Sequence, residues 1–194
     1  MAQPVIEGGT GVSRSLSTDE ASRLTSEQTP SIRVRQPLLS EILTRVHKAK
    51  NKGDMIKILR EENCEPLQQI LQWAYNPTLA SDLPSGIPPY VQNDAPEGTP
   101  PYVENEAPEG TEHMLLRTEG DKLYNFIKGA NTHQSTIRER MFIRLLEGLH
   151  KDEAKLLCTV KDKKLGSAGG IKGLSIPVVS EAFNWDENFR LKGV

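Results

Sequence analysis

The sequence is poor in aromatic residues and in cysteine. Aromatic residues make up 5% of the 194 positions, and the two cysteines, Cys64 and Cys158, lie far apart in the chain, with no histidine or further cysteine at metal-ligand spacing. We therefore expect two reduced packing thiols and neither a disulfide nor a zinc site. No apolar run approaches the roughly 18 residues that a membrane-spanning helix needs. The first residues also lack the basic region and apolar stretch of a secretory signal, so we expect no membrane partner and no export.

Familiar catalytic motifs are absent as well. The sequence has no glycine-rich phosphate loop ending in Gly-Lys-Ser/Thr, no Gly-x-Ser-x-Gly turn, no His-Glu-x-x-His and no Cys-x-x-Cys. Its four histidines are scattered, and the carboxylates of Glu119 and Asp121 fall at the start of a helical segment, where they offset the helix dipole. These absences predict a protein that is not an enzyme and that needs no cofactor or metal ion.

Positive charge is missing from one long stretch. The formal net charge is -2, yet no Lys or Arg occurs between Arg60 and Arg117, where ten of the 26 acidic residues lie. All 24 cations therefore lie in the two flanking parts, together with only 16 acidic residues. Local potential, more than net charge, attracts a phosphate-bearing partner. The flanks are therefore candidates for nucleic-acid binding despite the acidic total.

What the sequence does contain is mainly helical patterning. Apolar residues recur at three- and four-residue spacing between about residues 37 and 75, and again between about 114 and 183. This pattern predicts an all-α fold, a small helical domain of about six to seven helices over residues 37–184. We expect a flexible N-terminal arm (1–36) before it and a C-terminal tail (185–194) after it. The arm would be either an unstructured tail or a segment that docks on a neighbouring subunit.

An acidic, proline-rich insert interrupts the helical pattern over residues 77–112. It contains a tandem repeat, residues 88–99 followed by residues 100–111, in which ten of twelve positions are identical. Two proline-rich copies are too few for a repeat fold with a shared core, so we expect an extended segment. The simplest interpretation is a recent duplication in a tolerant surface loop. Tyr90 and Tyr102, at matching positions of the two copies, would then be available to a partner.

The most informative stretch runs from Ser135 to Phe183. Two helical segments predict a hairpin, followed by lysines, a glycine-rich run and a helix that begins near Ser175. A basic loop that leads into a helix N-terminus favours anion binding. The lysines that follow the first predicted helix form a second cluster, which either binds phosphate or offsets the dipole at that helix's C-terminus. The candidate phosphate contacts are Lys48, Lys50, Lys52, Arg138, Arg144, Lys161, Lys163, Lys164 and Lys172, with backbone N–H groups at Gly169, Gly170 and Ser175.

The order of these elements resembles the helical N-terminal DNA-binding domain of tailed-phage ATP-dependent DNA ligases. Glu41 to Tyr75 is similar to the opening helices of that domain, Lys161 and Asp162 with the following glycines look like its turn, and Ser175 to Phe183 looks like its closing helix. The whole chain also looks like a family of uncharacterised proteins of T-even-like phages, most closely between Arg140 and Lys164.

The ligase resemblance implies a module that grips duplex DNA and stands without the catalytic domain. A ligase carries a Lys-x-Asp-Gly nucleophile motif, and the Lys161, Asp162, Lys163, Lys164 run departs from it. The expected function is therefore non-enzymatic binding of double-stranded DNA through backbone phosphates, without sequence readout. The expected location is the host cytoplasm, and the protein could also be incorporated in the virion.

A structural or assembly protein of the virion, or an adaptor to a phage or host protein, is the alternative. The long arm and the extended insert suit wrapping around a protein neighbour. Trp185 and Phe189, in the tail, would either pack against the core or contact that partner. The sequence favours no particular oligomeric state.

Overall fold

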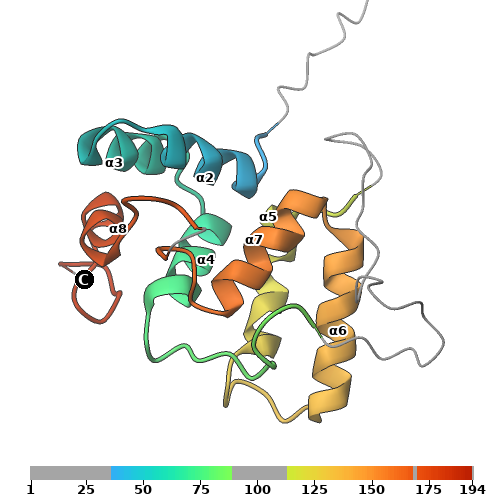
Figure 1. Cartoon of the computed structure of the whole chain (residues 1–194). Helices are drawn as coiled ribbons and strands as arrows, with labels where there is room; N and C mark the ends of the chain where they lie inside the picture. Colours follow the sequence, from blue (N-terminus) through green and yellow to red (C-terminus); the bar gives the residue numbers. More distant parts are fainter. Residues whose placement is uncertain (1–35, 89–112, 168–169, 194) are drawn as a thin grey trace, which may run out of the picture. The chain divides into compact units, whose positions relative to one another are not determined.

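The computed structural model describes residues 36–88, 113–167 and 170–193 and shows an all-α arrangement (Figure 1). Its elements are α2 (Leu39–Lys48), α3 (Lys52–Glu61), α4 (Glu65–Tyr75), α5 (Leu116–Glu119), the 3-10 helix η1 (Gly120–Phe126), α6 (Ser135–Gly148), α7 (Lys151–Lys161) and α8 (Ile176–Phe183). Seven α-helices and no β-strand in these ranges confirm the predicted fold class. Within the same ranges, no helix has the length and apolar character to cross a membrane.

Two predicted features fall outside this part of the chain. Apart from Gln36, the expected N-terminal arm (1–36) is not among the described residues, and the same is true of the tandem repeat (88–111) apart from Pro88. The arm and the repeat therefore stay predictions from the sequence.

The α2 helix shows directly how the apolar pattern becomes core. Its buried residues, which lie at i, i+3, i+4 and i+7, are Leu39, Ile42, Leu43 and Val46. The chain then turns, and the Asn51 side chain accepts the backbone N–H of Asp54 at 2.8 Å to begin α3. The periodic stripe thus fixes which face of α2 is inside, and the cap fixes where α3 starts.

The α3 helix packs against α8, far away in the sequence (Figure 1). The Arg60 guanidinium donates to the backbone carbonyls of Glu181 and Ala182, at 2.8 and 3.2 Å. These carbonyls belong to the last turn of α8, whose carbonyl groups have no partner within the helix. Arg60 therefore holds the C-terminal end of α8 on α3.

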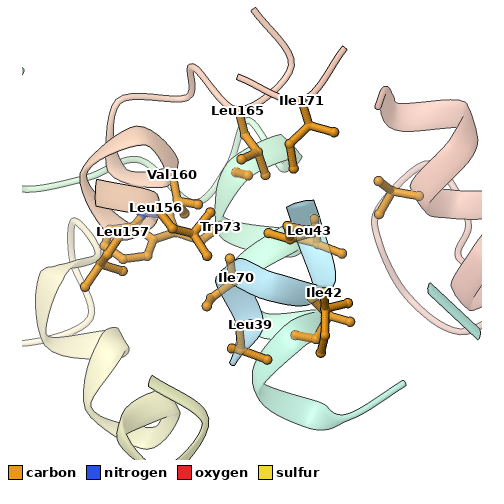
Figure 2. Packing of buried hydrophobic residues seen from close by; sticks show 14 of the residues in the cluster. Leu39, Ile42, Leu43, Ile70, Trp73, Leu156, Leu157, Val160, Leu165 and Ile171 are labelled. Carbon is orange, nitrogen blue, oxygen red and sulfur yellow. The ribbon is translucent and has the colours of Figure 1, made fainter. Parts of the chain in front are cut away.

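The α4 helix lies at the centre of the core and packs against α7. Ile70 and Trp73 of α4 are buried, and Figure 2 shows Trp73 beside Leu156, Leu157 and Val160 of α7. The Trp73 ring also stacks on Phe126, with centroids 6.5 Å apart. Trp73 is thus a core residue, in keeping with the usual place of a large aromatic side chain.

The segment after the insert is tighter than an α-helix. The apolar pattern predicts one helix from about Met114 to Lys128, whereas the structure has a single turn, α5, followed by the 3-10 helix η1. Residues three apart share a face in a 3-10 helix. Gly120, Leu123 and Phe126 follow that spacing, and all three are buried. Burial of this stripe against α4 explains the tighter winding.

A buried carboxylate joins three helices. Glu153 of α7 is fully buried, and its two carboxylate oxygens accept the backbone N–H groups of Leu39 at 3.0 Å and Leu116 at 2.8 Å. These are the first residues of α2 and α5, where N–H groups lack partners within the helix. Burial raises the pKa of the Glu153 carboxyl, while the two backbone N–H bonds act in the opposite direction. One side chain thus satisfies the starts of two helices.

Candidate nucleic-acid interface

Three of the predicted phosphate contacts come together at the C-terminal end of α2. The backbone N–H of Lys172, in the segment between α7 and α8, donates to Nδ1 of His47 at 3.2 Å. Lys48, Lys50 and Lys172 are all exposed, and none of them makes an ion pair or a side-chain hydrogen bond with another described residue. We call these three residues the lysine patch. Its ammonium groups are free, within this part of the chain, to meet an anion.

Lys52 lies next to the patch but is already engaged. Its Nζ is 2.7 Å from Oε2 of Glu181 on α8, and both side chains are about half exposed. The Lys52 ammonium lowers the pKa of the Glu181 carboxyl through this hydrogen bond and through its charge. The pair joins the start of α3 to α8, so Lys52 would reach a phosphate only by leaving Glu181.

A groove between α2 and α7 opens beside the lysine patch. It has a volume of about 380 Å³, and buried Leu43, Leu165 and Ile171, which Figure 2 labels, lie along it. The hydroxyls of Thr44 and Thr159 already donate to backbone carbonyls of their own helices. One acidic and one basic side chain, Asp152 and Lys155, also line the groove, so it is less cationic than the lysine patch. An anion would bind at the patch itself.

Two of the predicted contacts, Lys161 and Lys163, are committed to the protein itself. The buried Lys161 Nζ donates to the Pro84 carbonyl at 2.6 Å and to Oδ1 of Asp162 at 2.5 Å. Lys163 Nζ donates to the carbonyls of Trp73 and Asn76, the latter at 2.8 Å. The prediction that both bind phosphate is therefore wrong in this structure.

The reason lies in carbonyl groups that only the fold brings near. The Lys163 side chain closes the C-terminal end of α4, where carbonyls lack helical partners. Burial lowers the pKa of the Lys163 ammonium to about 8. The Lys164 side chain, by contrast, is 65% exposed, and its Nζ lies 3.4 Å from Oδ2 of Asp162. Of Lys161, Lys163 and Lys164, only Lys164 stays accessible.

Of the two arginines predicted on the hairpin, one is structural and one is exposed. The Arg138 side chain is 7% exposed and pairs with Asp82 at 2.7 Å, so its assignment as a phosphate contact is wrong. Arg144 is exposed and makes no ion pair or side-chain hydrogen bond with another described residue. Arg140, which is not among the predicted contacts, is also exposed and lies four residues before Arg144. The i, i+4 spacing of Arg140 and Arg144 makes them neighbours on the helix surface, and this spacing was the sequence signal for a second, smaller cationic surface.

Gly170, in the glycine-rich run, is needed for its small size and does not offer a free hydrogen-bond donor. The backbone N–H of Gly170 donates to the Ser167 carbonyl at 2.9 Å, and is therefore not available to a phosphate as predicted. A Cβ atom at this position would lie 2.1 Å from the Leu165 carbonyl oxygen, so only glycine fits. Gly169 lies outside the described residues. Ser175 is exposed and precedes α8, and its side chain makes no capping hydrogen bond.

The aromatic residues of the tail belong to the core. Trp185 and Phe189 are 1% and 6% exposed, their ring centroids lie 5.8 Å apart, and the Phe183 ring lies 4.9 Å from that of Trp185. Of the two interpretations left open by the sequence, packing against the core is the one observed, and the assignment as partner contacts is wrong. Tyr90 and Tyr102, the other predicted partner contacts, lie outside the described residues.

Among the residues that the structure describes, the other titratable groups form no recognisable reactive cluster. In the described ranges no three His, Cys, Asp or Glu residues are grouped so as to hold a metal ion. The rings of His113 and His150 lie 5.3 Å apart near Glu153, and Nδ1 of His150 accepts the backbone N–H of Asp152 at the start of α7. Cys158 is partly buried, and burial raises the pKa of its thiol to about 11, which disfavours the reactive thiolate.

Comparison with known proteins identifies the family. The model of a family of unknown function (DUF6433) matches residues 42–101 and 95–167, which together cover more than half of the chain. The chain belongs to this family. The two matched segments overlap over residues 95–101, where the first copy of the tandem repeat passes into the second. No curated protein and no solved structure matches the chain.

Proposed function

We propose that this member of the DUF6433 family is a phage-encoded, non-enzymatic protein that binds double-stranded DNA through backbone phosphates, without reading the sequence. The observation that carries the proposal is the lysine patch: three exposed lysines from two distant segments that the hydrogen bond from the Lys172 backbone N–H to His47 brings together, without an anionic partner in the described residues. Lysine contacts of this kind position a protein on DNA but carry no sequence information.

The reduced set of contacts sets the expected strength of binding. Of the nine predicted cationic side chains, Lys161, Lys163 and Arg138 are turned inward and Lys52 is paired. Of the five that remain, Arg144 and Lys164 lie outside the lysine patch, which leaves the three lysines of the patch as contacts at one place. Three phosphate contacts predict that affinity falls by about 40-fold between 50 and 200 mM salt. Binding should therefore be weak and strongly dependent on salt, as for a nonspecific DNA-binding protein.

The test is a titration of a labelled DNA duplex with the full chain, followed by fluorescence anisotropy at several salt concentrations. We expect the combined substitution Lys48→Ala, Lys50→Ala and Lys172→Ala to reduce binding at low salt by at least about tenfold and to flatten the salt dependence. The matched control is Lys128→Ala, Arg190→Ala and Lys192→Ala, which removes the same charge from exposed positions that are not predicted phosphate contacts. It should retain most of the affinity.

Two outcomes would overturn this assignment. Equal losses in both triple variants would mean that overall charge, and not the lysine patch, holds the DNA. Absence of binding at 25 mM salt would favour the alternative role, a virion or adaptor protein whose tandem repeat contacts another protein. In that case the protein should appear at stoichiometric amounts in mass spectrometry of purified particles.

A further inference from the structure

The groove between α2 and α7 adjoins the lysine patch. His47 and Ile171 line the groove, and each is followed in the chain by a lysine of the patch, Lys48 and Lys172. The hydrogen bond from the Lys172 backbone N–H to His47 joins the two segments at this point. Leu43 and Ile171 give the groove apolar surface (Figure 2). An occupant that fits both features would combine an apolar side chain with acidic groups a few residues away.

Residues 89–112 begin and end at opposite ends of α7. Before this segment, the backbone N–H of Gly86 donates at 2.8 Å to Oδ2 of Asp162, the residue that follows α7. After it, the ring centroid of His113 lies 5.3 Å from that of His150, the residue that precedes α7. The segment itself lies outside the described residues. Its two neighbours in the chain, however, are anchored beside the helix that forms one wall of the groove.

The groove follows α7 over much of its length, since Asp152 and Thr159 of this helix both line it. The 11 residues of α7 make a helix about 16 Å long. The 24 residues from 89 to 112 can extend over about 80 Å, and one copy of the repeat over about 40 Å. The segment is therefore long enough to connect the two ends of α7 by way of the groove.

The composition of this segment matches the groove and the patch. It contains six acidic residues and no Lys or Arg, whereas the patch holds three exposed lysines without an anionic partner in the described residues. Each copy of the repeat has a tyrosine, Tyr90 or Tyr102, between apolar neighbours. Acidic residues follow each tyrosine within two to seven positions: Asp94 and Glu97 in the first copy, and Glu104, Glu106 and Glu109 in the second.

We propose that one copy of the tandem repeat docks in the groove of its own chain, with its tyrosine on the apolar surface and its carboxylates at the lysine patch. Opposite charges at the patch favour this placement. The consequence for DNA rests on the proposed function: phosphates would have to displace the docked copy, so the repeat lowers the affinity of the protein for duplex DNA.

The first test is cross-linking of the full chain with a carbodiimide, which joins a carboxylate to an amine that it contacts. An equal mixture of unlabelled and nitrogen-15-labelled protein distinguishes links within one chain from links between two chains. We expect links from residues 89–112 to Lys48, Lys50 or Lys172 within one chain. They should be at least about fivefold more abundant than links to Lys192, an equally exposed lysine elsewhere.

Two variants separate the apolar contact from the charge contact. Tyr90→Ser combined with Tyr102→Ser changes no charge and should lower the yield of the patch links by at least about threefold. Thr44→Glu, at an exposed position of the groove, repels the acidic segment and should have a similar effect. The control is Thr118→Glu, because Thr118 is also exposed and its hydroxyl, like that of Thr44, donates to a nearby backbone carbonyl. It should leave the yield unchanged.

The second test measures the affinity of the double tyrosine variant for the DNA duplex. It should bind at least about threefold more tightly than the wild type at equal salt, if the repeat leaves the patch free in only about a third of the molecules. Links mainly between two chains would show that the repeat docks on a second copy, and equal linking to Lys192 would show no preferred site. Either result would overturn the proposal. Cross-linking needs no DNA, so it decides the docking even if the duplex does not bind.

Discussion

Arg138 Nη1 lies 2.7 Å from Oδ2 of Asp82, and this pair connects the first turns of α6 to the segment that follows α4. The same guanidinium donates to the backbone carbonyls of Asp82 and His133, at 3.2 and 2.7 Å. A residue that the sequence offers as a phosphate contact therefore holds three segments together. The positive charge of Arg138 is therefore neutralised inside the protein. Loss of the guanidinium would leave the Asp82 carboxylate without its counter-ion, which costs free energy.

Removing this guanidinium should destabilise the fold. Arg138→Met leaves the Asp82 carboxylate and two carbonyls without their donor, and we expect a loss of about 2 kcal/mol, below the range for fully buried pairs because Asp82 is partly exposed. Arg144→Met, on the exposed face of the same helix, should change stability by less than about 0.5 kcal/mol. Urea unfolding followed by circular dichroism measures both. Equal effects of the two substitutions would contradict the structural role of Arg138.

The Lys163 side chain predicts an unusual dependence of stability on pH. Burial lowers the pKa of this amine from 10.5 to about 8 in the folded protein, while the unfolded chain keeps the ordinary value. Between pH 8 and 10.5 the unfolded state therefore binds more protons, so the Lys163 contribution to stability rises with pH across that window and is lost as pH falls through about 8. A neutral amine still has two N–H groups for the carbonyls of Trp73 and Asn76.

The comparison is between the wild type and Lys163→Met in urea at pH 7.5, 9 and 10.5. We expect the stability difference between them to grow by about 1 to 2 kcal/mol in favour of the wild type, a figure reduced for the partial exposure of the side chain. A difference that stays constant over this range would mean that the Lys163 amine titrates normally.

Periodic apolar residues made much of this fold predictable, because the spacing of apolar residues within a helix determines which of its faces is buried. The stripe from Leu39 to Val46 is an example, since every one of its four apolar positions is buried. Whether a lysine is exposed or buried, by contrast, could not be predicted from the residues around it in the sequence. Whether Lys163 meets solvent or the end of α4 depends on a segment about 90 residues earlier, and nothing near Lys163 in the sequence encodes that meeting. Spacing alone therefore separated helices from loops but not surface cations from buried ones.

Glu153 is a second residue whose role could not be predicted from its neighbours in the sequence, and it yields a further prediction. Its partners Leu39 and Leu116 lie 114 and 37 residues away, so the sequence showed only an acidic residue in the first turn of a helix. Glu153→Ala leaves two buried N–H groups without an acceptor, and we expect a loss of about 3 kcal/mol. Glu153→Gln keeps one acceptor oxygen and should lose roughly half as much.

Asp152 provides the matched control for Glu153, because it is the adjacent carboxylate and is 56% exposed. Asp152→Asn should change stability by less than about 0.5 kcal/mol. All three substitutions are compared by their urea unfolding midpoints at pH 7. A loss below about 1 kcal/mol for Glu153→Ala would show that water or another group replaces the carboxylate at the starts of α2 and α5.

One of the two copies of the tandem repeat should be dispensable for folding. The two family matches overlap where the copies meet, which suits a duplication within the connection between Pro88 and His113. Deleting residues 100–111 halves that connection, and for a segment without contacts of its own this changes the closure free energy by only about 0.6 kcal/mol. The Tm should therefore shift by no more than about 3 °C. A larger fall would show that the second copy, with Tyr102, packs against the helical domain. An unchanged Tm with lost binding to DNA or protein would instead assign the repeat a role in recognition.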